Sequence, residues 1–349
     1  MKKDILTMQK IKYDYRKTVL VLKKLYIPFI ICFLLFFVAC HSNPADTTVN
    51  STQVTTSTTA KASHTAIENF VFEETNGNIS ITQYIGSDKQ VVIPERINNK
   101  AVTHIASASF LRNKDIVSVT LPNTVTSIGT YAFRDCESLT TVTLSENLEK
   151  IDGSAFENCA KLTDIILPKS LKQISSKAFS NCRSLKQIAI FKNCTIGPEA
   201  FYNSGLENIT FETGVTQIPD TGFAGTNIQT LVLPNTVQTI GRQAFAGCQK
   251  LSVVSLSEGL KTVGDLAFYN TNLKEIIIPS TVTQIKESSF GNCANLDKIK
   301  FEGNAPDNFL RLLQDQHLKP ENVHFTIFYH KTASGFTSPE WNGYPSEIW

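Results

Sequence analysis

Five of the eight cysteines stand at equivalent places in the chain, so they are the first side chains to consider as reactive groups. Each follows a phenylalanine by three residues, and they are Cys136, Cys159, Cys182, Cys248 and Cys293. If successive copies of this segment stack at strand spacing, neighbouring thiol-bearing Cβ atoms lie about 5 Å apart, which is long for a disulfide. A straight row also cannot converge into the tetrahedron that zinc requires. We therefore expect free, buried thiols, and we expect Cys194 to belong to the apolar core.

The other residue types that could carry catalysis give no constellation. The six histidines are scattered at His41, His64, His104, His317, His324 and His330. None of them recurs with a carboxylate and a nucleophile at a spacing typical of a triad. The chain also has no glycine-rich phosphate loop and no run of calcium-ligand carboxylates. We expect no enzymatic activity, no metal and no cofactor.

The elements that position these side chains repeat along the chain. A phenylalanine, usually preceded by alanine, recurs every 22 or 23 residues at Phe110, Phe133, Phe156, Phe179, Phe201, Phe223, Phe245, Phe268 and Phe290. Each copy also carries an alternating apolar segment such as Leu139–Leu144 and a second apolar pair such as Leu148 and Ile151. No copy can bury these groups alone, whereas stacked copies bury them against one another. The sequence predicts a mainly β repeat solenoid with about nine rungs of 22–23 residues between two caps.

One face of the repeated strands is the candidate binding surface. Residues that alternate with the buried strand positions must point outward, and two such positions occur in every rung. The most distinctive of them are Asp164, Ile166, Thr210, Thr230, Val232, Glu275 and Ile277. Threonine and valine here can also reflect strand propensity alone. Exposed apolar residues in line can instead mark a contact surface, which predicts a protein ligand laid across the strands, with weak charge selection by Asp164 and Glu275.

The repeat pattern resembles that of the BspA-like leucine-rich repeat proteins of bacterial surfaces. The matching residues include Leu231-Val232-Leu233-Pro234, followed by Val237, Ile240-Gly241, Ala244-Phe245 and Cys248, and the resemblance covers roughly residues 79–303. The cysteine in the turn fits the BspA-like variant. The resemblance implies a leucine-rich repeat array and adhesion to host matrix proteins or to other cells.

The N-terminal segment is typical of a protein exported across a membrane. Residues 1–40 contain eight of the 33 basic and two of the 31 acidic residues, which leaves 25 basic and 29 acidic residues in the remainder. This mildly acidic remainder does not suggest a nucleic-acid partner. An apolar run, residues 25–39, follows the basic residues, and Phe37-Val38-Ala39-Cys40 resembles a lipoprotein box with Phe37 in place of the usual leucine. We expect lipidation at Cys40 and an extracytoplasmic, membrane-anchored location. An uncleaved anchor and simple secretion are the alternatives.

The remaining boundaries follow from composition and turn residues. Residues 41–66 are rich in Ser and Thr and predict a flexible tether. Residues 67–105 form the expected N-terminal cap with a first atypical repeat, in which Asn76-Gly77 predicts a hairpin turn. The repeats occupy residues 106–303. The C-terminal cap, 304–349, contains an expected helix after Pro306 and a strand over 323–329.

The C-terminal cap also raises two alternative functions. It holds both tryptophans of the chain, and Trp341, Tyr344 and Trp349 could form an aromatic platform of a carbohydrate-binding module. The simpler interpretation is that these aromatics close the open end of the stack. A purely structural role in the cell envelope is the remaining alternative to protein binding.

Overall fold

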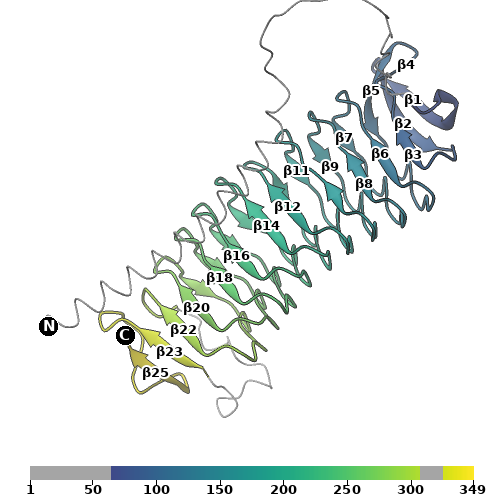
Figure 1. Cartoon of the computed structure of the whole chain (residues 1–349). Coiled ribbons are helices and arrows are strands. Elements are labelled where there is room, and N and C mark those ends of the chain that lie inside the picture. Colours follow the sequence, from purple (N-terminus) through teal and green to yellow (C-terminus); the bar gives the residue numbers. More distant parts are fainter. Residues whose placement is uncertain (1–63, 307–324) are drawn as a thin grey trace, which may run out of the picture. The chain divides into compact units, whose positions relative to one another are not determined.

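The computed structural model describes residues 64–306 and 325–349 of the 349-residue chain, and these residues fall within one compact unit, 60–349. The leader, Cys40, most of the predicted tether and the expected helix after Pro306 lie outside the described residues. Each repeat contributes a strand to a front row, then a shorter strand to a second row, and then a tight turn that carries the phenylalanine. Figure 1 shows the two rows as parallel ladders of arrows. The sequence-based prediction of a repeat solenoid is confirmed. Within the described residues the stack has about 11 turns, compared with about nine predicted rungs between two caps, and almost no helix.

The front row consists of short parallel strands that carry the candidate binding surface. Its members are β3 (Gln90–Val92), β6 (Ser118–Thr120), β8 (Thr141–Thr143), β10 (Asp164–Ile165), β12 (Gln187–Ile190), β14 (Asn208–Phe211), β16 (Thr230–Val232), β18 (Val253–Ser255), β20 (Glu275–Ile278) and β22 (Lys298–Phe301). β-Branched residues favour these strands. A proline follows several of them, as at Pro168 and Pro234, and ends the pairing because it has no N–H to donate.

The second row lies one turn further along each rung. It contains β5 (Lys100–Ile105), β7 (Ser127–Ile128), β9 (Lys150–Ile151), β11 (Gln173–Ile174), β13 (Thr195–Ile196), β15 (Gln217–Ile218), β17 (Thr239–Ile240), β19 (Thr262–Val263) and β21 (Gln284–Ile285). These strands pair in parallel register, for example Gln173 with Lys150 and Ile174 with Ile151. The hydrogen-bonded row is interrupted between β13 and β15.

A column of aromatic rings forms the centre of the core. The nine repeat phenylalanines are almost completely buried. Consecutive rings stack with centroids 4.8–5.8 Å apart and planes within 22° of parallel. Tyr84 of the N-terminal cap continues the column, 5.2 Å from Phe110. The rung spacing thus falls within the range of centroid separations at which aromatic rings stack favourably.

The two caps close the ends of this column. At the N-terminus, η1 (Ile67–Asn69) precedes the hairpin of β1 (Phe70–Thr75) and β2 (Asn78–Tyr84), whose turn residues Asn76 and Gly77 both have positive φ as predicted. β4 (Arg96–Ile97) forms a second hairpin with β5. At the C-terminus, β23 (Thr326–Tyr329), β24 (Glu340–Trp341) and β25 (Tyr344–Ile348) extend the front row. No helix in the described part of the chain has the length and apolar character that a membrane crossing requires.

Candidate functional site

The exposed face of the front row, which we call the strand face, carries the predicted binding residues. Ala189 pairs with Thr210 and Val232 pairs with Ser255 on neighbouring strands, while the hydrogen-bonded front row is interrupted between β10 and β12 and between β14 and β16. Ile166 is 70% exposed and Val232 is 55% exposed, so both point away from the core as predicted. Thr210 is exposed as well. Three of the predicted residues therefore lie on one accessible surface.

The other predicted residues are less accessible or not described. Thr230, Glu275 and Ile277 are half-buried. Asp164 begins β10, but its side chain lies outside the described residues. Val253, 48% exposed, lies beside Thr230 on the adjacent strand and belongs to the same apolar patch. The sequence could have revealed Val253, because most other rungs carry a polar residue at the equivalent outward-facing strand position.

At the C-terminal end of the strand face, Glu275, the residue predicted to select a ligand by charge, has a partner in the free protein. Lys300 on the next strand binds the Glu275 carboxylate, with Nζ 2.7 Å from Oε1. The same ammonium group lies 5.6 Å from the ring centroid of Trp349, which also stacks on His330 at 4.7 Å. The Glu275 carboxylate is therefore paired with Lys300 in the free protein. Asp164, on another rung, is the other residue predicted to select a ligand by charge.

The aromatic platform proposed for carbohydrate binding does not form as predicted. Trp341 is 6% exposed and Tyr344 is 8% exposed, so neither can present a ring face to a sugar. Trp341 packs against Phe301 and Phe336 and donates its Nε1–H to the Gly335 carbonyl at 2.6 Å. Trp349 is half-buried against Lys300 and His330. These aromatics close the end of the stack, which confirms the simpler interpretation of the cap.

The repeated cysteines are buried hydrogen-bond donors. All six described cysteines are free and buried. Cys136, Cys159 and Cys182 each donate their thiol to the carbonyl of the phenylalanine one rung earlier, with Sγ···O distances of 3.1, 3.0 and 3.2 Å. In the shorter turns a hydroxyl group donates in place of the thiol. Ser204 Oγ, for example, donates to the Phe201 carbonyl of its own rung at 2.8 Å. These carbonyls also accept a backbone N–H, as Phe133 does from Cys136 at 3.2 Å, so the thiol or hydroxyl is a second donor that uses the other lone pair of the buried oxygen.

We predict that these thiols stay unreactive until the protein unfolds. Burial raises the pKa of Cys136 from its ordinary value near 9 to about 12, and burial raises the pKa of Cys159 well above that ordinary value. Because the thiolate is the nucleophile, a chromogenic disulfide reagent at pH 8 should modify none of the repeated thiols within minutes, and all of them in denaturant. Cys194, which at 8% is the most exposed of the six described thiols, should react first. Rapid native labelling of Cys159 or Cys182 would contradict this assignment.

The same shifts predict a pH dependence of stability. The native protein keeps its thiols protonated, whereas the unfolded chain loses these protons above about pH 9. The unfolded state then binds fewer protons than the native state, so the free energy of unfolding should fall as the pH rises from about 9 toward 12. Denaturant titrations at pH 8 and pH 10 measure this difference, and equal values would show that the thiols titrate alike in both states.

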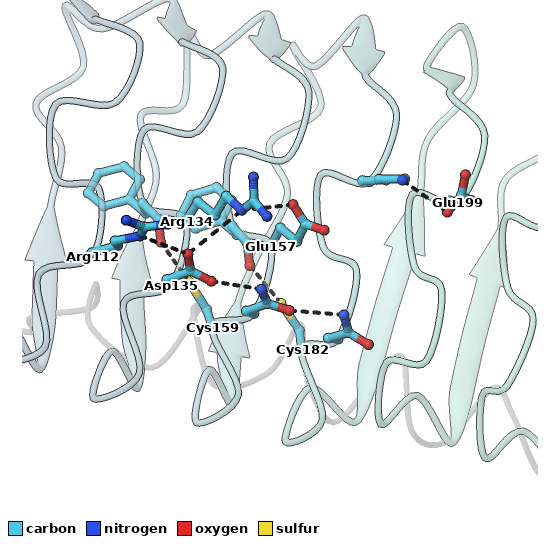
Figure 2. Close-up of polar contacts among 12 residues, drawn as sticks. Arg112, Arg134, Asp135, Glu157, Cys159, Cys182 and Glu199 are labelled. Carbon is cyan, nitrogen blue, oxygen red and sulfur yellow. Dashed lines mark hydrogen bonds and ion pairs between the residues drawn. The ribbon is translucent and has the colours of Figure 1, made fainter.

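A polar ladder runs beside the cysteines across neighbouring rungs. Asn158 donates to Asp135 at 2.7 Å, and Asn181 donates to Asn158 at 2.9 Å. Figure 2 shows Arg112 and Arg134 meeting Asp135 and Glu157 above this ladder, with the shortest ion pair, Arg134–Glu157, at 3.1 Å. Two positive and two negative side chains balance one another here. The ladder therefore links adjacent turns and leaves no unbalanced charge for a ligand.

The described residues hold no group of three or more His, Cys, Asp or Glu side chains that could bind a metal ion. Each of the five repeated cysteines donates its thiol to the carbonyl of the phenylalanine one rung earlier. The features with room for a ligand are thus the strand face and the hollows at the turns between rungs.

Comparison with known proteins identifies the repeat. The profile of the BspA type leucine rich repeat region matches residues 103–228 and 216–310. A leucine-rich repeat protein from Bacteroides ovatus is 24% identical, with 82% of this chain and 76% of that chain covered and a TM-score of 0.66. A leucine rich repeat protein of T. pallidum is 24% identical over 67% of this chain and 91% of its own, with a TM-score of 0.46.

A leucine rich cell surface protein from Faecalibacterium prausnitzii is 22% identical, with 80% of this chain and 96% of that chain covered and a TM-score of 0.33. No curated protein sequence matches. At such identities the similarity to the B. ovatus structure concerns the fold. The profile match, in contrast, extends over more than half of the 349 residues, and so the chain belongs to the BspA-type leucine-rich repeat family.

Proposed function

We propose that the protein is a non-catalytic, cell-surface binding protein that holds a protein ligand across its strand face. The observation that carries this proposal is the exposure of Ile166, Val232 and Val253 on a surface that is otherwise mostly polar. Isolated exposed apolar residues are common on soluble proteins. Here the stacked rungs place them on one face, at positions that are fixed before any ligand arrives, which lowers the ordering cost of association.

The dimensions of this patch favour a protein over a small molecule. Ile166 and Val253 are four rung steps apart, and at strand spacing this distance is roughly 19 Å. No described side chain between them closes a pocket, since Ala189, Thr210 and Asn208 stand on the same open surface. A surface of this kind suits an extended or flat protein segment that contacts several strands at once. The buried aromatic cap removes the observation that would have favoured carbohydrate binding at that end.

The proposal places this surface outside the cytoplasm on a lipid anchor. Its support is the basic leader, the apolar run and the lipoprotein-like box that ends at Cys40, together with the family's resemblance to bacterial surface proteins. The Ser/Thr-rich residues 41–66 would then separate the anchored end from the repeats. Such a spacer lets the strand face reach a partner beyond the membrane.

Direct capture tests the proposed activity. The full-length chain in detergent would be passed over immobilised fibronectin, fibrinogen, laminin and collagen, and in parallel over a glycan array. We expect saturable binding to at least one matrix protein, and we expect this binding to persist in the presence of free sugars. Binding to glycans alone would replace this proposal with carbohydrate recognition. Binding to neither would favour a structural role in the envelope.

We predict that Cys40→Ser abolishes anchoring. The hydroxyl cannot form the thioether through which a lipoprotein carries lipid, so the variant should leave the membrane fraction or remain as an uncleaved precursor. Fractionation and intact-mass measurement of the N-terminus check this outcome, with the buried-site variant Cys194→Ser as a matched control that should remain anchored. An unmodified, uncleaved N-terminus in the parent protein would rule out lipidation at Cys40.

A further inference from the structure

A hollow of about 600 Å³ opens at the outer turns of three successive rungs, away from the strand face. It is lined by Lys169, Ser170, Leu171, Lys172, Phe191, Lys192, Asn193 and Glu212. We call it the outer notch. Its volume falls within the range of sites for small ligands, which is roughly 300–1,000 Å³. In a stack of nearly identical rungs, such a hollow requires a local cause.

The cause is a rung that is one residue short. Leu171 precedes Ile174 by three residues, whereas the equivalent Cys194 precedes Ile196 by two. Register nevertheless resumes at once, because Thr195 pairs with Gln173 and Ile196 pairs with Ile174. The turn itself keeps its closing hydrogen bond, from the Cys194 N–H to the Phe191 carbonyl at 3.3 Å, so the missing residue lies between this turn and the second-row strand. The second row of strands is interrupted directly after this rung, between β13 and β15.

Substitutions at the repeat's proline position also alter this rung and the next. Phe191 and Glu212 occupy the place that Pro168 and Pro234 hold in other rungs. Without proline, the Glu212 N–H continues the front-row ladder to the Ile190 carbonyl at 2.9 Å. The Glu212 carboxylate accepts the Lys192 N–H at 2.8 Å, which fixes it at the edge of the notch. Three departures from the repeat thus converge on one hollow.

A second hollow supports this account of how such spaces arise. It measures about 370 Å³ and lies at the opposite corner, lined by Arg183, Asn203, Ser204, Gly205, Gly225 and Asn227. The turns after Phe201 and Phe223 are the shorter variety there, with Ser204 and Thr226 in the place of cysteine. Both hollows therefore lie at rungs that are shortened. The outer notch differs from the second hollow in its aromatic floor and its concentration of lysines.

The outer notch carries excess positive charge. Three lysines and one glutamate line it, and Lys172 is engaged by Glu149 at 2.7 Å. Across residues 64–306 and 325–349, neither Lys169 nor Lys192 makes an ion pair. Their ammonium groups remain available to a ligand anion. Phe191, which is half-buried against the core, adds an apolar surface between them.

We propose that the outer notch binds an acidic sugar, namely a uronic acid residue. Lys169 and Lys192 hold its carboxylate, Phe191 packs against the apolar face of the ring, and Asn193 with Glu212 hydrogen-bonds to its hydroxyls. The notch spans two rung steps, roughly 10 Å at strand spacing, which admits one pyranose ring across the rungs. A neutral sugar leaves both ammonium groups unpaired, and a simple anion leaves the aromatic surface uncovered. This site is independent of the strand face.

Binding of galacturonic acid trimers to the full-length chain tests this proposal, with saturation-transfer NMR and calorimetry as readouts. We expect saturable binding that exceeds binding of neutral maltotriose and of acetate by at least about tenfold, and that weakens with salt. Lys169→Gln with Lys192→Gln should weaken trimer binding by roughly tenfold or more, since two charge-assisted contacts are lost. Lys298→Gln, at an exposed lysine of the strand face, is the matched control and should leave binding unchanged.

Two results would overturn the proposal. One is equal affinity of the parent and the double lysine variant for the trimer. The other is equal affinity of the parent for the trimer and for maltotriose or acetate, which would reduce the notch to a general surface or a simple anion site. Ile166→Ser with Val232→Ser separates this proposal from protein binding, because that variant should retain the trimer whatever it does to a protein ligand.

Discussion

Phe179→Ala should lower the free energy of unfolding by about 3–5 kcal/mol, the largest loss that we expect from a single substitution in the repeats. Phe179 is completely buried and stacks on Phe156 at 5.2 Å and on Phe201 at 5.3 Å. Truncation removes both ring contacts and leaves a cavity in the middle of the column. In a stack whose rungs touch only their neighbours, this cavity weakens two interfaces at once. Denaturant unfolding followed by circular dichroism measures the loss.

Phe179→Leu is the matched control for this prediction. Leucine keeps most of the buried apolar volume but loses the stacking, so its cost should be well below that of alanine. A loss of under about 1 kcal/mol for alanine would mean that the column does not hold the array together. The stability would then have to come from the strand ladders and the polar links between turns.

Ile166→Ser combined with Val232→Ser should weaken binding of the protein ligand by about 2–4 kcal/mol, or roughly 30- to 1,000-fold in Kd. Both side chains are exposed in the free protein, and a ligand laid across the strands would bury them. Serine removes the apolar area and keeps the backbone ladder intact. The free energy of unfolding should therefore stay within about 0.5 kcal/mol of the parent. Calorimetry or surface plasmon resonance with the captured matrix protein gives the affinity.

Gln173→Ser combined with Gln238→Ser is the matched control, because these two residues lie at the second row of strands and not on the strand face. Both glutamines are exposed and lie on the same two rungs as Ile166 and Val232. This variant should bind as the parent does. If the isoleucine–valine variant also binds normally while folding normally, the strand face is scaffold, and the outer turns and caps become the surfaces to test.

The sequence predicted the fold because the determinants of each rung are local and repeated. The period of the phenylalanines, the alternating strand residues and the Asn76-Gly77 turn each appear in the structure where the pattern placed them. Tyr84 was not recognised as part of the ring column because it precedes Phe110 by 26 residues, outside the period, and belongs to a hairpin strand. The hairpin through Asn98 and Asn99 was missed as well, although two asparagines with positive φ are typical of such turns.

The candidate site was only partly predictable, because exposure depends on neighbours far away in sequence. Ile166 and Val232 follow the strand alternation, and the structure exposes both. Glu275 follows it too, but Lys300 of the next rung neutralises it, and alternation carries no information about that partner. The outer notch was not predicted because it results from an absent residue between Cys194 and Ile196, which leaves no side chain to recognise.

Site-specific photo-crosslinking tests the central claim, that the strand face is the binding surface, most directly. Ile166→p-benzoylphenylalanine and Val232→p-benzoylphenylalanine place a crosslinker on the strand face of the full-length chain. The same residue at Gln173, in β11, and at Gln238, directly before β17, places it at the second row of the same rungs. Irradiation with the captured matrix protein should give a covalent complex from positions 166 and 232 and none from 173 and 238. Crosslinks from the second row alone, or equally from both rows, would contradict the account.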